Sequence, residues 1–261
     1  MAESKGGTAL ITGATDGVGR VVARALGKDG WRVLPHGRDR ARGEALGRET
    51  GQGGGRAAEV RGLAEAVRAA TDRLDLLINN AGIGTAGNAP GRRTSADGHE
   101  LRFAVNYLAG FLLTHLLLPL LKASAPARIV NVSSAGQQAI DFSDVMLTRQ
   151  YSGVAAYCQS KLAQILFTVD LARELEGSDV IVNALHPSTY MNTTMVRQAG
   201  VSPMSRVEDG AKAILQLAVS PALAGRSGLY FNVLREARAN AQAYDAEARR
   251  KLRALSLELT G

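Results

Sequence analysis

Short apolar runs alternate with longer amphipathic stretches along the whole chain. Helical spacing of the apolar residues predicts helices over 20–28, 63–70, about 97–122 and about 154–175. Compact β-prone runs predict strands at Thr8–Thr12, Trp31–Pro35, Leu74–Ile78, Arg128–Val132, Asp179–Leu185 and Leu229–Val233. Such alternation implies right-handed crossovers and a parallel sheet. We therefore expect an α/β fold in which helices cover both faces of a doubly wound sheet of about seven strands.

Several segments between these elements have a less regular pattern. A polar helix is expected over 39–50, followed by a glycine-rich break and a short third strand over 56–60. Residues 137–153 form an irregular excursion, and residues 189–205 form a long segment of the kind used as a substrate lid. The tail predicts a charged helix over about 237–259. With no repeat or linker, the chain 1–261 is predicted to be one domain.

Composition narrows the class of protein. The chain has 261 residues, 46% of them hydrophobic, and a net charge of +7, but its arginines are spread too thinly to predict a nucleic-acid partner. The single cysteine, Cys158, excludes an intrachain disulfide and suits a reducing cytoplasm. The N-terminus is polar, and the longest apolar segment, Phe111–Leu121, falls short of the roughly 20 residues of a membrane span. We expect a soluble cytoplasmic protein without a membrane anchor.

A glycine cluster follows the first strand. Gly13, Gly17 and Gly19 stand between that strand and a helix, where glycines let a backbone approach a pyrophosphate at the helix N-terminus. The alternative is a plain tight turn. At the end of the second strand no acidic residue is available for a ribose hydroxyl, whereas Gly37 leaves space and Arg38 suits a 2′-phosphate. This pattern favours NADP over NAD, unless Arg38 is a solvated loop residue.

Candidate chemistry lies on the helix that begins near Val154. Tyr157 and Lys161 are four residues apart, which places a phenol and an ammonium on one helix face, although such pairs also occur on solvated helices. Ser134 follows the strand 128–132 at the carboxyl edge of the sheet, where open α/β sheets bind ligands. Asn106 lies within an apolar helical face, either as a satisfied core residue or as a purposeful interruption.

Together these segments resemble the classical short-chain dehydrogenase/reductase family over almost the whole chain. The resemblance is carried by Thr12-Gly13-Ala-Thr-Asp-Gly17-Val-Gly19, Asn79-Asn-Ala-Gly82, Asn106, Ser134 and Tyr157-x-x-x-Lys161, in family order. Details such as Arg128-Ile-Val-Asn-Val-Ser-Ser134 and the insertion before Tyr157 look like the retinol dehydrogenase-like branch. The resemblance implies a Rossmann-type fold and an oxidoreductase that uses NADP(H), or NAD(H), on a small alcohol or carbonyl substrate.

The resemblance also implies roles for individual residues. Tyr157 would be the general acid and base, with its phenolate stabilised by Lys161 and by the positively charged oxidised nicotinamide. Ser134 would bind the substrate oxygen, and Asn106 would support a water chain. The cofactor would contact Gly13, Thr15, Asp16, Gly17, Val18, Gly19, Arg38, Asn80, Ala81, Gly82, Tyr157, Lys161, Pro187 and Ser188. Such enzymes often form homodimers or homotetramers through their central helices, and the apolar face Leu162–Val169 suits that role or core burial.

Two segments depart from the family pattern. The segment 56–70 is short for this branch, and Glu59 is the candidate for the acidic residue that relatives place near the adenine. After His186, Ser188 replaces the usual glycine, so that Asn192 or Thr193 must stand in for the threonine that binds the carboxamide. The competing function is a dinucleotide sensor built on the same fold, which would not need the complete set of Asn106, Ser134, Tyr157 and Lys161.

Overall fold

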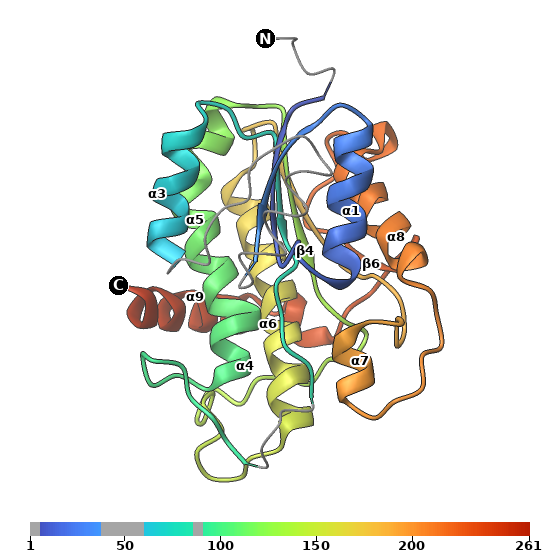
Figure 1. Cartoon of the computed structure of the whole chain (residues 1–261). Coiled ribbons are helices and arrows are strands. Elements are labelled where there is room, and N and C mark those ends of the chain that lie inside the picture. The colour runs from blue at the N-terminus through green and yellow to red at the C-terminus, as the bar shows by residue number, and fades with distance from the viewer. Residues whose placement is uncertain (1–5, 38–59, 86–90) are drawn as a thin grey trace.

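The computed structural model describes residues 6–37, 60–85 and 91–261, which form one seven-stranded sheet between two layers of helices (Figure 1). The strand order is β2-β1-β3-β4-β5-β6-β7. The first six strands run parallel, and only β7 is antiparallel. The strands are β1 (Thr8–Thr12), β2 (Arg32–His36), β3 (Leu76–Asn79), β4 (Ala127–Val132), β5 (Val180–His186), β6 (Tyr230–Asn232) and β7 (Arg235–Ala237).

This sheet confirms the predicted fold class, but two parts of the chain differ from the predicted elements. Six predicted strands are present, with ends that differ by at most two residues from the prediction. The expected helix over 39–50 and residues 56–59 of the expected third strand lie outside the described residues, and Val60 begins a helix. The seventh described strand is β7, which pairs back on β6 as a short hairpin that the apolar pattern did not predict.

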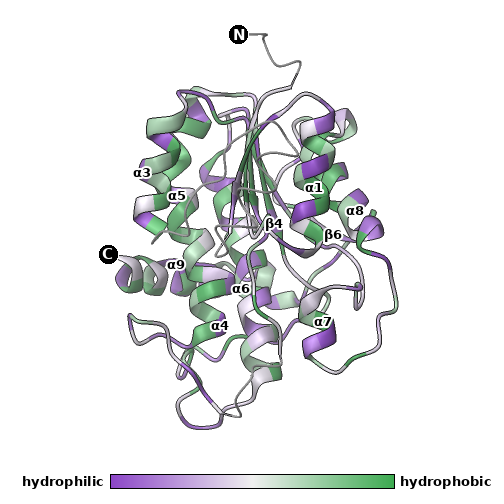
Figure 2. Ribbon diagram, viewed as in Figure 1, coloured by the Kyte–Doolittle hydropathy of each residue, from purple (hydrophilic) through white to green (hydrophobic). Residues whose placement is uncertain are grey.

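Helices cover both faces of the sheet. On one face lie α1 (Gly17–Lys28) and α8 (Val207–Val219); on the other lie α3 (Val60–Ala70), α5 (Ala109–Ala123) and α6 (Gly153–Glu174) (Figure 1). Each layer buries its own apolar cluster against the sheet, one around Val22 and Ile214 and one around Leu117 and Leu166. Figure 2 shows the resulting pattern, with hydrophobic residues along the strands and the inner helix faces.

The long helix predicted from about residue 97 begins later and is interrupted. The Glu100 carboxylate accepts a hydrogen bond from the backbone N–H of Phe103 at 2.7 Å and so caps α4 (Leu101–Phe103). A π-helical turn, η1 (Ala104–Leu108), then joins α4 to α5 and contains Asn106. Because π turns inside α-helices frequently mark functional sites, this break supports the second interpretation of Asn106.

The helical run Leu101–Ala123 is longer than the apolar segment considered in the sequence. By length and composition alone it could cross a membrane. Half of it is buried inside the protein, however, and its apolar residues pack on the sheet and on α6. The run is therefore accounted for as a core helix of the fold.

The C-terminal tail is not one helix from residue 237. Ala237 ends β7, and a 3-10 turn, η3 (Ala241–Tyr244), precedes α9 (Ala246–Thr260). The break has a local cause, because the Asn240 side chain caps η3 and the Asp245 side chain caps α9. Two further short elements, α7 (Thr194–Gln198) and the 3-10 turn η2 (Pro221–Leu223), complete the described set.

Helix α9 packs against α6 and the π turn. Arg253 pairs with Asp170 and Glu174 on α6, and the buried hydroxyls of Ser256 and Tyr107 are 2.6 Å apart. The apolar face Leu162–Val169 on α6 was expected either to form an oligomer interface or to be buried in the core. Residues 162–168 are buried within the chain itself, as the second alternative predicts.

The docking of α9 predicts a sharp contrast between two leucines. Leu252 is 1% exposed, so Leu252→Ala should lower the free energy of unfolding by about 2–5 kcal/mol through the cavity it leaves. Leu257 on the same helix is 52% exposed, and Leu257→Ala should change stability by less than about 0.5 kcal/mol. Urea unfolding followed by circular dichroism measures both. Equal effects of the two variants would contradict the docking of α9 described above.

Candidate active site

The turn between β1 and α1 has a backbone that requires glycine. Gly13 and Gly17 have φ angles of 67° and 53°, in the region that side chains disfavour. At Gly19 a Cβ would lie 2.4 Å from the carbonyl oxygen of Gly13 and 2.5 Å from the side-chain nitrogen of Asn80. Asp16 caps α1 by accepting the Gly17 N–H at 2.8 Å. The turn therefore presents bare backbone at a helix N-terminus, as an anionic group requires.

A hydroxyl and an amide clamp this turn to the loop after β3. The Thr12 hydroxyl oxygen accepts hydrogen bonds from the backbone N–H groups of Asn80 and Ala81, both at 3.0 Å. In return, the Asn80 side chain donates to the carbonyl oxygens of Thr12 and Gly13, at 2.8 and 3.1 Å. Two loops that are far apart in sequence thus form one surface at the carboxyl edge of the sheet. Thr12 was part of the quoted motif but was not assigned a role.

The end of β2 reaches the same edge. A Cβ at Gly37 would lie 2.3 Å from the Thr15 side chain, so position 37 has no space for a larger residue while Thr15 stays in place. Val18, predicted with Thr15 as a cofactor contact, is buried beneath the turn in the α1 layer. Arg38, which follows Gly37, lies outside the described residues.

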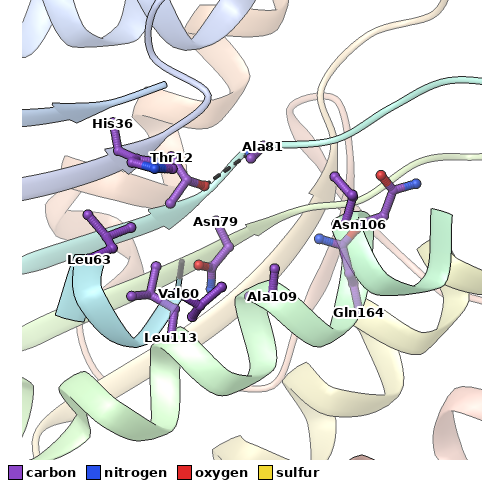
Figure 3. A pocket seen from close by; sticks show the side chains of 12 residues that line it. Thr12, His36, Val60, Leu63, Asn79, Ala81, Asn106, Ala109, Leu113 and Gln164 are labelled. Atoms are coloured by element: carbon purple, nitrogen blue, oxygen red, sulfur yellow. Dashed lines mark hydrogen bonds between the residues drawn. The ribbon is translucent and has the colours of Figure 1, made fainter. Parts of the chain in front are cut away.

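A small cavity lies beneath this edge, between the sheet and α5 (Figure 3). Its volume is about 60 Å³, and most of its lining is apolar, from residues such as Val60, Leu63 and Leu113. Two polar side chains on its wall have atoms without a hydrogen-bond partner among the described residues, namely both ring nitrogens of His36 and Oδ1 of Asn79. Burial lowers the pKa of His36 and so disfavours its charged form.

Asn106 connects the π turn to two other parts of the site. Its Oδ1 accepts the N–H of Ile83 at 2.8 Å, and its Nδ2 donates to the Ile83 carbonyl oxygen at 3.1 Å and to Ser160 Oγ at 3.0 Å. Ser160 in turn donates to the carbonyl oxygen of Tyr157 at 2.7 Å. The side chain of Asn106 therefore positions the loop after Gly82 and the helix that carries Tyr157.

Ser134 and Tyr157 meet beyond the end of β4. The Ser134 side chain is close enough to Tyr157 to lower the pKa of its phenol. Burial acts in the opposite direction and dominates, so the pKa of Tyr157 is raised overall. Lys161 Nζ lies 5.8 Å from the centre of the tyrosine ring. Stabilisation of the phenolate by Lys161 together with an oxidised nicotinamide stays a prediction.

The main chain of Ser134 is fixed by two residues that the sequence did not single out. Its carbonyl oxygen accepts hydrogen bonds from the Tyr230 hydroxyl and from Nε2 of Gln137, both at 3.1 Å. Gln137 is itself held by the backbone N–H of Asn240, which donates to its Oε1 at 2.7 Å. No sequence motif indicates either contact, because strand β6 and the irregular segment after β4 come together only in the folded chain.

Lys161 is buried at the centre of the site. Its Nζ donates to the Val132 carbonyl oxygen at 2.9 Å and to Gln164 Oε1 at 3.0 Å. Burial lowers the pKa of Lys161 to about 7. A Cβ at Gly82 would lie 3.6 Å from this Nζ and 3.2 Å from Asn106 Oδ1, so the glycine keeps Lys161 open toward the loop surface.

The segment 189–205 is tied together at its base. Ser188 Oγ donates to Ser205 Oγ at 2.8 Å, and Ser205 Oγ donates to the Thr189 carbonyl oxygen at 2.7 Å. The hydroxyl of Ser188, which was predicted as a cofactor contact, is thus used to hold the ends of this segment together. Pro187, the other predicted contact, packs toward α8, 3.5 Å from where a Cβ of Gly210 would lie.

The helix α7 within this segment lies over the rest of the site. Thr193, its N-cap, comes within 3.4 Å of the position that a Cβ on Gly17 would occupy. Met195 crowds the corresponding position on Gly84 at 2.8 Å. Of the two residues considered for the missing threonine, Thr193 is therefore the one shown beside the glycine turn.

These features fit a dinucleotide. The bare turn at α1 suits a pyrophosphate, the loop Asn80–Gly82 runs beside it, and Tyr157, Ser134 and Lys161 lie at the far end of the same edge. The arrangement provides a proton donor, a hydroxyl for a polarised oxygen and a cation within one site.

Comparison with known proteins agrees with this arrangement. The family model described as short chain dehydrogenase matches residues 7–202. Human retinol dehydrogenase 13 is 38% identical to this chain, over 98% of the chain and 85% of the relative. Mouse retinol dehydrogenase 14 is also 38% identical, over 98% of the chain and 86% of the relative.

Solved structures share the fold over most of the chain. An uncharacterized protein from Mycobacterium paratuberculosis has a TM-score of 0.79 at 30% identity, covering 99% of this chain and 94% of its own. The complex of Pseudomonas aeruginosa RhlG with NADP has a TM-score of 0.70 at 28% identity, covering 87% and 94%. The 3-ketoacyl-(acyl-carrier-protein) reductase from Brucella melitensis with NADH has a TM-score of 0.67 at 28% identity, covering 87% and 96%. With its glycine turn, its sheet and its matched length, this chain belongs to the short-chain dehydrogenase family, in the retinol dehydrogenase-like branch.

Proposed function

We propose that this protein is an NADP(H)-dependent oxidoreductase that interconverts an alcohol and a ketone or aldehyde, with Tyr157 as general acid and base. The observation that carries the proposal is the meeting of Tyr157, Ser134 and Lys161 at the edge of the sheet that also presents the glycine turn. Members of this family bind NAD(P)(H). A protein that only senses a dinucleotide would need the glycine turn but not these three side chains.

The residues of the chain divide the proton chemistry among themselves. Tyr157 accepts the hydroxyl proton of an alcohol, or donates a proton to a carbonyl oxygen in the reverse direction. Ser134 donates a hydrogen bond to the same oxygen as negative charge develops there, and its main chain is held by Tyr230 and Gln137. When bound, the nicotinamide takes up or supplies the hydride, and its oxidised form adds positive charge near the site.

Charge is what the protein alone leaves incomplete. Burial raises the pKa of Tyr157 and lowers that of Lys161 to about 7, so it shifts both groups toward their neutral forms. A protonated Lys161 and the positive charge of the oxidised nicotinamide would together favour the Tyr157 phenolate. On this proposal Tyr157 becomes a competent base only in the complex, which restricts proton abstraction to the loaded enzyme.

Two observations support a preference for NADP. Position 37, where an acidic residue would hold an unsubstituted ribose, is a glycine packed against Thr15, so a carboxylate there would collide with the glycine turn. The next residue in sequence is Arg38, whose guanidinium suits a phosphate. The preference is thus supported by the lack of space for a carboxylate that would bind the ribose hydroxyl, and by the positive charge of Arg38 for a 2′-phosphate.

The surroundings of Tyr157 support an apolar substrate. Tyr190 lies near enough to Tyr157 to contribute to its raised pKa, and Tyr190 is exposed. Val154, which begins the same helix three residues before Tyr157, and Met195, over Gly84, are also exposed. We assign to the segment 189–205 the role of a substrate lid, because it carries Tyr190 and Met195 and lies against both Gly17 and Gly84.

Removal of the Tyr157 hydroxyl tests the mechanism. Tyr157→Phe should lower kcat for alcohol oxidation by about 10²–10⁴-fold, because the general base is lost. NADPH affinity, measured by nucleotide fluorescence, should stay largely intact. Tyr244→Phe is the control, because among the described residues that hydroxyl accepts a hydrogen bond from the backbone of Ala239 and none joins it to the site. Full turnover by Tyr157→Phe would refute the proposed mechanism.

Reversal of charge at position 38 tests the cofactor preference. Arg38→Asp should weaken NADPH binding by roughly 10- to 100-fold, the value of a charge-assisted hydrogen bond, with a smaller change for NADH. Arg235→Asp makes the same change of charge at β7, the opposite edge of the sheet from β2, and should leave the ratio of the two affinities unchanged. The preference is wrong if the unmodified protein binds NADH as tightly as NADPH.

A further inference from the structure

Gln164 is a buried polar residue of α6 to which neither the motifs nor the mechanism assign a role. Gln164 is 4% exposed, and it follows Lys161 by three positions, on the same side of the helix. Its Oε1 accepts a hydrogen bond from Lys161 Nζ at 3.0 Å. Gln164 also lies on the wall of the cavity described above, together with Asn106 (Figure 3).

The donors of Lys161 are nearly all committed. An ammonium has three N–H donors, of which one points to the Val132 carbonyl oxygen and one to Gln164 Oε1. Val132 belongs to β4 and Gln164 to α6, so these two acceptors hold Nζ between the sheet and the helix. As far as the described residues show, the remaining donor is left for the side of Gly82, where the absence of a Cβ leaves room.

The electrostatic surroundings make this acceptor important. The pKa of Lys161 is lowered by burial. No carboxylate among the described residues raises it again. Tyr157 on α6 lies beside Lys161, with its ring centre 5.8 Å from Nζ, and His36 at the end of β2 lines the cavity that Gln164 also lines. Ser133, whose hydroxyl donates to the Lys161 carbonyl oxygen, Ser134 after β4 and Asn106 in the π turn are all neutral groups. A carbonyl dipole that accepts from the ammonium favours its charged form.

We propose that Gln164 is a positioning residue of the active site, which keeps Lys161 charged and directs its free N–H toward the cofactor. The proposal rests on the function proposed above, since it gives Lys161 a task in that site. It does not depend on the packing of Gln164, because the contact of Gln164 with Thr168 runs through the main-chain carbonyl oxygen and survives replacement of the side chain.

Direct titration of Lys161 tests the proposal without turnover. The protein has six lysines, and a cofactor-free sample with ¹³C at the lysine Cε, compared with Lys161→Met, identifies the buried one by NMR. Gln164→Leu should move the Lys161 titration midpoint down by about one pH unit, the effect of one lost hydrogen bond to a charged group. Gln164→Glu should move it up, because a carboxylate replaces the amide dipole.

A matched control is available on the same helix. Gln159 is 1% exposed and donates to the Val145 carbonyl oxygen at 2.5 Å, away from Lys161. Gln159→Leu removes a buried glutamine amide from α6 and should leave the Lys161 midpoint unchanged. An unchanged midpoint in Gln164→Leu, or an equal shift in Gln159→Leu, would overturn the proposal.

Kinetics separate this proposal from the proposed function. In Gln164→Leu, kcat for alcohol oxidation should fall several-fold at pH 7 relative to the unmodified protein and recover toward pH 5.5, where Lys161 is protonated in both, while KM for the alcohol stays constant. A loss of kcat that does not vary with pH would overturn the positioning role. If Tyr157→Phe retains turnover while the Lys161 midpoint still shifts, the proposed function fails and the contact from Gln164 to Lys161 stands.

Discussion

The site depends on a buried cation, Lys161, whose pKa no carboxylate of the described residues raises. Desolvation of Lys161 costs free energy that only hydrogen-bond acceptors can offset here, and Val132 and Gln164 supply them from a strand and a helix. The polar layer continues below. Asn79 donates to Asn131 at 2.9 Å, Asn131 to Thr168 at 2.8 Å, and Thr168 to the main chain of Gln164 at 2.8 Å. These bonds link β3, β4 and α6 beneath the chemistry, so the spacing between sheet and helix is set by polar contacts as well as by apolar packing.

The loops at the carboxyl edge are held by the same kind of contact. Thr12 and Asn80 exchange hydrogen bonds between two loops, Asn106 fixes Ile83 and Ser160, and Tyr230 fixes the main chain of Ser134. Every one of these bonds satisfies a main-chain or side-chain group that the end of a strand or a π turn would otherwise leave unpaired. A loop surface that approaches a ligand through its backbone is thereby kept rigid without bulky side chains.

Much of this fold could be predicted from the sequence, because strands such as Leu76–Asn79 are compact apolar runs and helices such as α1 have clear apolar periodicity. The same pattern missed the late start of α4 and the break between η3 and α9, where capping by Glu100 and Asp245 outweighs periodicity. Motif spacing named Ser134, Tyr157 and Lys161. It could not name Gln164 or Tyr230, because a buried Gln or Tyr has no distinctive neighbourhood until strand and helix meet.

The contact between Gly37 and Thr15 bears on how coenzyme use could change over evolutionary time. The two residues belong to different loops, and a Cβ at 37 would lie 2.3 Å from the Thr15 hydroxyl and methyl. A substitution at 37 alone therefore damages the phosphate turn before it can serve a new ribose, whereas replacement of Thr15 by a smaller residue first would open the space. Substitutions that share a contact are not additive. A change of coenzyme use through position 37 therefore depends on the order in which the two positions mutate. This single contact acts as an epistatic barrier.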